Sequence, residues 1–141
     1  MVSAILDRPT ASRLTLNDFM TGFLAALAAR KVSVVSIRGT EFYAAVVQTF
    51  EALEDRAADL NLNLKFWLTQ DTTHGDAPEV REGITKAVQR DLISLDNPTY
   101  TQMRLKISQD DAQRYLTRVP GGSDVFLELA DVFMDAYPSY R

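Results

Sequence analysis

Hydrophobic positions recur along the chain with two periods. Where they fall three and four residues apart they predict amphipathic helices, and where they alternate they predict half-buried strands. The helical period occupies five stretches: 15–31, 40–60, 76–88, 108–119 and 123–137. The alternating or β-branched pattern occupies four: 32–37, 62–69, 92–95 and 100–107.

Polar residues at the predicted helix starts support these boundaries. We expect Thr15 or Asn17 to cap the first helix and Thr40 to cap the second, because their side-chain oxygens can accept a hydrogen bond from the first turn. Asp76 lies three residues before Glu79, which is the spacing of a capping box at the third helix.

The order of elements predicts how the strands pair. Strand 32–37 carries apolar side chains on both sides, so we expect it to be central and covered on both faces. Strand 32–37, the helix that follows it and strand 62–69 predict a βαβ unit. In such a unit the two strands are parallel and joined by a right-handed crossover. Strands 92–95 and 100–107 flank a short turn and predict a C-terminal hairpin.

These elements predict a single globular domain over residues 1–141. We expect an α+β (mixed α/β) fold, with one mixed sheet of about four strands packed with about five helices. Residues 1–14 contain Pro9 and no clear period, so they are expected to form an extended lead-in. A chain of 141 residues with 46% hydrophobic residues suits one such domain.

Composition narrows the classes of function. The chain has no cysteine, which excludes disulfides, thiolate zinc sites and iron–sulfur clusters. The longest apolar run, Phe23 to Ala29, is far shorter than the roughly 20 residues that a membrane helix needs. No basic segment precedes the apolar residues Met1 to Leu6, so we expect no secretory signal. Together these features indicate a cytoplasmic protein without a membrane partner.

The loop after strand 62–69 is the first candidate binding site. Arg38 could bind an anion, Thr40 could supply a hydroxyl group for hydrogen bonding, and Asp71 and His74 could transfer a proton. They follow the ends of two strands, where open α/β sheets place their ligands. The alternative interpretation is an ordinary polar surface loop, and the sequence favours it.

We expect neither a metal nor a cofactor. Asp71, His74, Asp76 and Glu79 match neither the EF-hand nor any zinc spacing, and no glycine-rich phosphate loop is present. An enzyme using the loop at 70–76 is therefore a less favoured hypothesis than a binding protein.

A basic and aromatic surface is the second candidate. Lys65 and Trp67 on one strand, with Tyr100, Arg104 and Lys106 on another, would share a sheet face that could bind single-stranded nucleic acid or an anionic ligand. The net charge of −4 argues against bulk attraction to nucleic acid. The alternative interpretation is the solvated side of two amphipathic strands.

The last helix is the third candidate. Its acids are spaced four, three and four residues apart and form one narrow ridge: Asp124, Glu128, Asp131 and Asp135. Most of the remaining circumference is apolar and includes Phe126, Leu129, Phe133 and Tyr137. Such a helix is either wedged inside the domain or part of a protein interface, and the sequence does not separate the two.

The preferred hypothesis from the sequence is a cytoplasmic protein-interaction module or a small subunit of a larger assembly. It would dock through the apolar C-terminal helix to a protein partner or to a second copy, and the acidic ridge would select a basic partner.

Overall fold

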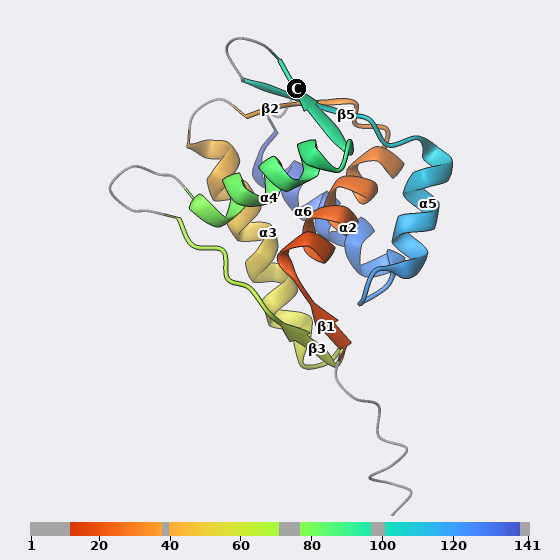
Figure 1. The fold of residues 1–141 in the computed structure, drawn as a ribbon. Helices are drawn as coiled ribbons and strands as arrows, with labels where there is room; N and C mark the ends of the chain where they lie inside the picture. Colours follow the sequence, from red (N-terminus) through yellow and green to blue (C-terminus); the bar gives the residue numbers. More distant parts are fainter. Residues whose placement is uncertain (1–11, 38–39, 71–76, 97–100, 139–141) are drawn as a thin grey trace, which may run out of the picture.

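The computed structural model describes residues 12–37, 40–70, 77–96 and 101–138 (Figure 1). The fold is α+β, as predicted. Along the chain the elements are β1 (Ser12–Leu14), α2 (Leu16–Ala29), β2 (Val34–Ser36), α3 (Glu41–Ala57), β3 (Leu62–Leu64), α4 (Pro78–Gln89), β4 (Ile93–Leu95), β5 (Gln102–Leu105), α5 (Gln109–Arg118) and α6 (Ser123–Ala136).

Helix α2 is the centre of the molecule. Helices α4, α5 and α6 pack around it (Figure 1), and every residue from Phe19 to Ala28 is buried. A helix that is apolar on nearly all sides is stable only where neighbouring elements cover it from several directions. Gly22 lets α6 approach closely, because a Cβ at this residue would lie 2.6 Å from Cε1 of Phe126.

The predicted helix caps are confirmed at α2 and only in part elsewhere. The amide of Asp18 donates to the Thr15 hydroxyl, and the Thr15 amide donates back to the Asp18 carboxylate, which forms a capping box. Thr40 occupies the N-cap position of α3, but its side chain makes no capping hydrogen bond. The N-cap of α4 is Ala77 and makes no side-chain capping hydrogen bond, so the expected cap at Asp76 is wrong by one residue. Pro78 occupies the first turn of α4, a position that suits proline.

The strands form two small sheets, so the predicted single sheet is wrong. Strands β2, β5 and β4 form an antiparallel sheet in that order, and the β4–β5 hairpin is confirmed. Strand β3 pairs in parallel with β1, at the other end of the molecule (Figure 1). Strand β2 is therefore an edge strand, and the predicted βαβ pair of β2 with β3 does not form.

The error has a clear physical origin. Alternation reports which side chains are buried, and it is the same whichever strand supplies the hydrogen bonds. The predicted alternation of 62–69 is confirmed: Phe66 and Leu68 are buried while Lys65 and Trp67 are exposed, although only Leu62–Leu64 pairs as a strand. The partner of that strand is β1, which lies within the predicted lead-in.

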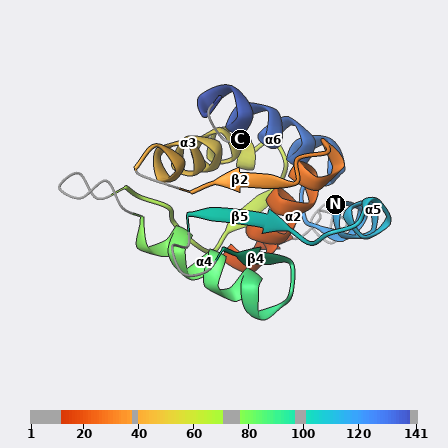
Figure 2. The same ribbon diagram turned by 90° about the horizontal axis from the view of Figure 1, so that it is seen from above.

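The three-stranded sheet packs on the helices through one face. Val35 and Met103, which are paired across β2 and β5, are fully buried on that side. Gln102 and Arg104 of β5 point the other way and are exposed. Seen from above, the three strands lie in front of the helices (Figure 2). The outer face of this sheet is consequently open and polar.

Candidate functional site

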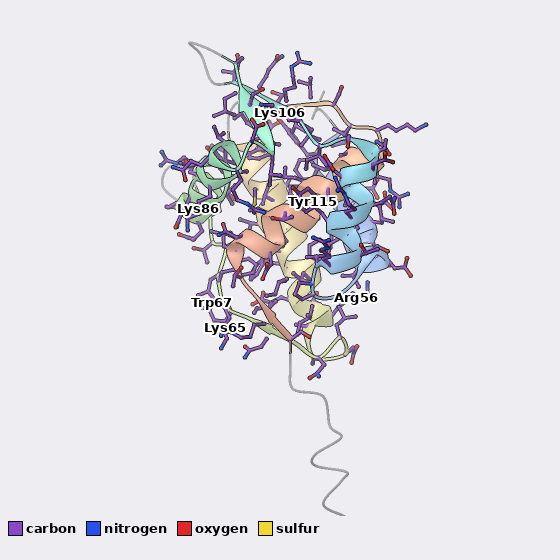
Figure 3. The ribbon with its side chains drawn as sticks, turned by 45° about the vertical axis from the view of Figure 1, so that its right-hand side comes forward. Arg56, Lys65, Trp67, Lys86, Lys106 and Tyr115 are labelled. Carbon is purple, nitrogen blue, oxygen red and sulfur yellow. The ribbon has the colours of Figure 1, made fainter. Side chains whose placement is uncertain are left out.

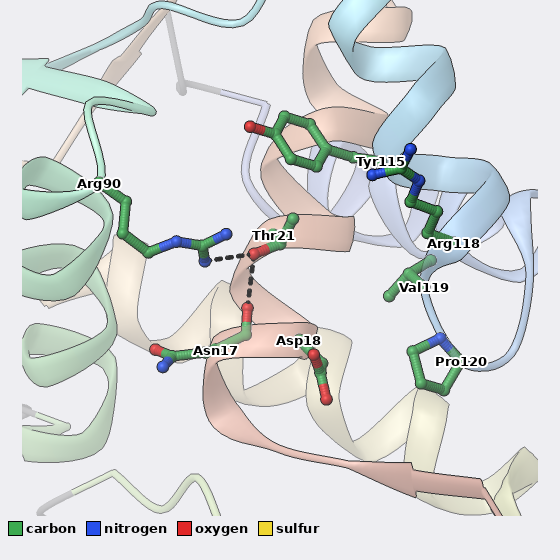
Figure 4. Close-up of a pocket in the computed structure, with 8 residues that line it drawn as sticks. All are labelled: Asn17, Asp18, Thr21, Arg90, Tyr115, Arg118, Val119 and Pro120. Carbon is green, nitrogen blue, oxygen red and sulfur yellow. Dashed lines mark hydrogen bonds between the residues drawn. The ribbon is translucent and has the colours of Figure 1, made fainter.

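A cavity of about 210 Å³ lies where three helices meet, at the start of α2, the end of α4 and the end of α5 (Figure 4). Six of its eight lining residues have polar side chains, and the lining comprises Asn17, Asp18, Thr21, Arg90, Tyr115, Arg118, Val119 and Pro120. Residues that are far apart in the sequence thus converge on one hollow beside the central helix.

Arg90 is held in this cavity by a hydrogen-bond chain. It is the C-cap of α4, and its guanidinium Nη1 donates to the Thr21 hydroxyl at 2.6 Å. That hydroxyl in turn donates to the carbonyl of Asn17, one turn earlier in α2, at 2.7 Å (Figure 4). Because Thr21 is only 9% exposed, its oxygen provides a fixed anchor for the guanidinium.

Helix α5 contributes the opposite wall. Tyr115 and Arg118 are three residues apart and therefore lie on the same side of the helix. Tyr115 is half-buried and Arg118 is exposed. Neither these two residues nor Arg90 belongs to a site predicted from the sequence. The spacing of Tyr115 and Arg118 was a usable signal, but no sequence pattern connects them to the end of α4.

The arginines of this cavity differ from three described arginines that form ion pairs. Within the described residues, neither Arg90 nor Arg118 forms an ion pair. In contrast, Arg114 pairs with Asp111, Arg30 with Asp131 and Arg56 with Glu128. The two guanidinium groups of the cavity therefore keep hydrogen-bond donors available for an external acceptor.

One carboxylate opposes them. Asp18 lines the same cavity and accepts a hydrogen bond from the Thr15 amide at 3.1 Å. The cavity also lies at the N-terminal turn of α2, where the helix dipole favours negative charge. Counting Arg90, Arg118 and Asp18, the lining carries a formal charge of +1, which favours an anion.

The predicted loop site lies largely outside the described residues. This applies to Arg38, Asp71 and His74. Thr40 is described and exposed, and its carbonyl accepts a hydrogen bond from the side chain of Gln70 at 3.3 Å.

The predicted basic and aromatic sheet face is wrong as a single surface. Lys65 and Trp67 follow β3 of the small sheet, whereas Arg104 lies in β5 of the other sheet. Lys106 lies near one end of the molecule and Lys65 and Trp67 lie toward the other (Figure 3). Lys106 is also paired with Asp91, and Tyr100 lies outside the described residues. The separation follows from the pairing of β3 with β1 instead of β2.

The apolar side of α6 belongs to the core of this chain. Phe126, Leu129, Phe133 and Tyr137 are all at most 4% exposed. The ring of Phe133 packs edge-on against Phe23 of α2 with centroids 5.0 Å apart. The structure therefore shows the wedged helix, and these four side chains offer no exposed docking surface.

The acidic ridge of α6 is exposed but partly neutralised. Glu128 and Asp131 form ion pairs with Arg56 and Arg30. Asp124 and Asp135 are exposed as well. The four acids of the ridge therefore lie on the surface, whereas the apolar side of the same helix is buried.

Comparisons with known proteins give no relative: no family model, no curated protein and no solved structure matches the chain. Among the described residues, none of the helices is long and apolar enough to cross a membrane. The same part of the chain contains no group of three or more side chains suited to hold a metal ion.

Proposed function

We propose that this protein binds a phosphate-bearing anion in the cavity formed by α2, α4 and α5. The observation that carries the proposal is the pair Arg90 and Arg118, two guanidinium groups that line one hollow and have no carboxylate partner among the described residues. Anionic-ligand binding was an alternative from the sequence, at a different surface.

The chemistry of the lining supports a phosphate group in particular. A guanidinium group presents about five N–H donors in a planar fork that matches the geometry of phosphate oxygens. The hydrogen bond to Thr21 uses one donor of Arg90 and holds the rest in place. Tyr115 also lines the cavity, and its hydroxyl group can donate a further hydrogen bond.

Calorimetric titration with inorganic phosphate at constant ionic strength tests this proposal. Each of Arg90→Gln and Arg118→Gln should weaken binding by at least about tenfold, since a hydrogen bond to a charged group contributes roughly 1.5–3 kcal/mol. Lys31→Gln is the matched control, because it removes the same charge from an exposed residue after the opposite end of α2. Equal losses in all three variants would reduce the effect to net charge and contradict the proposal.

The interaction hypothesis remains a second proposal in a reduced form. The acidic ridge is still exposed, so it could contact a basic partner or a second copy, whereas the apolar residues of α6 are buried.

Phe133→Glu should unfold the protein, as judged by circular dichroism, because it places a charge in the core. A folded variant with an altered assembly state would restore the apolar interface. A cytoplasmic location likewise stays a prediction.

A further inference from the structure

A second hollow adjoins the phosphate cavity. It measures about 200 Å³ and is lined by Asp111, Arg114, Tyr115 and Arg118. Tyr115 and Arg118 line both hollows, so a ligand could pass from one to the other along the same side of α5. Pockets for ligands of ordinary size have volumes of roughly 300–1,000 Å³. Neither hollow reaches that range alone, so a ligand of that size would have to extend over both.

The second hollow differs from the first in its chemistry. Arg114 and Asp111 form an ion pair with each other, so this hollow presents a donor and an acceptor side by side. A phosphate group offers acceptors only, whereas the edge of a nucleobase carries both donors and acceptors. Tyr115 lines both hollows and adds an aromatic ring, and base–aromatic stacking is a general way of binding a base.

We infer that the ligand is a nucleotide, with its phosphate between Arg90 and Arg118 and its base against Tyr115 beside the Asp111–Arg114 pair. This inference rests on the proposed function, since the phosphate contacts are those already described. The base is a second group that the protein would recognise, and both inorganic phosphate and a sugar phosphate lack it.

The test compares ribose 5-phosphate with the four common nucleoside monophosphates by calorimetric titration of the full chain. At least one nucleotide should bind about tenfold or more tightly than ribose 5-phosphate, as expected for one stacked base. Tyr115→Phe keeps the ring and should retain this gain. Tyr115→Leu keeps an apolar side chain for the core but removes the ring, and should lose the gain while still binding ribose 5-phosphate.

The outcomes separate the two proposals. Equal affinity for ribose 5-phosphate and all four nucleotides, or a gain that survives in Tyr115→Leu, would overturn the nucleotide assignment and leave the phosphate site intact. Failure of every phosphate compound to bind the wild-type protein would overturn both. Circular dichroism of each variant confirms that a lost gain is not a lost fold.

Discussion

The guanidinium of Arg90 donates a 2.6 Å hydrogen bond to the hydroxyl of Thr21 and joins the end of α4 to the central helix. This contact spans 69 positions in the sequence, and it turns an exposed helix end into a fixed wall of the cavity. The arrangement resembles the support that a binding group needs, because an anchored side chain loses less freedom when the ligand arrives.

Removing the anchor should weaken binding without unfolding the protein. Thr21→Val preserves the shape of the side chain and removes the oxygen that accepts from Arg90, so the affinity for inorganic phosphate should fall by about threefold or more. Thr49→Val is the matched control, since Thr49 is fully buried and its hydroxyl donates to the Ala45 carbonyl in the same way. The two variants should differ in a calorimetric titration; equal affinities would show that the anchor has no role in binding.

Neutralising the opposing acid should strengthen binding. Asp18→Asn keeps an oxygen for the Thr15 amide, so the capping box can persist, while one negative charge leaves the cavity. The interaction of two unit charges about 4 Å apart is roughly 1 kcal/mol even in water, so we expect an affinity gain of about threefold or more. Asp135→Asn, which changes an exposed acid on α6, should leave the affinity for phosphate unchanged. An Asp18→Asn variant that binds phosphate more weakly than the wild-type protein would argue against an anion in this cavity.

Two helical glycines should respond differently to alanine. At Gly22 the new methyl group would meet the fully buried ring of Phe126 at 2.6 Å, and overpacking of this kind lowers the free energy of unfolding by about 1–3 kcal/mol. At Gly83 it would meet Cγ of the buried Met20 at 2.7 Å, but the unbranched methionine side chain has three rotatable bonds and repacks more readily than a phenyl ring. Urea unfolding should therefore show Gly22→Ala clearly less stable than Gly83→Ala. The reverse order would contradict the close packing of α2 on α6.

Replacing Lys31 by glycine should stabilise the turn after α2. Lys31 has a φ of 65°, and its amide and that of Val32 bond back to Ala28 and Leu27, as in a Schellman motif. A left-handed conformation costs a residue with a side chain about 1 kcal/mol, so Lys31→Gly should raise the free energy of unfolding by up to about that amount. Ala29→Gly, in the last turn of α2, should lower it instead. Thermal unfolding of both variants measures the contrast; a destabilised Lys31→Gly would contradict the turn geometry.

Local features were predictable because they depend on neighbouring residues. The Thr15 cap, the alternating burial of 62–69 and the β4–β5 hairpin all follow from side chains a few positions apart. Strand partners were not predictable in this way, because β1 and β3 are separated by two helices and β1 is only three residues long.

The candidate site depends on long-range contacts, which local sequence patterns do not report. Arg90 ends one helix, Tyr115 and Arg118 lie near the end of another, and Thr21 is a polar residue in an otherwise apolar stretch. The two arginines have an ordinary local explanation as cations at the ends of helices. Only the packing of α4 and α5 on α2 brings them to one cavity.

The central claim is the location of the anion site, and NMR mapping of amide shifts during titration with inorganic phosphate tests it most directly. At constant ionic strength, the largest shifts should fall on the residues around Thr21, Arg90 and Arg118. Saturable shifts centred elsewhere, such as around the exposed Trp67, or the absence of any saturable shift, would contradict the account.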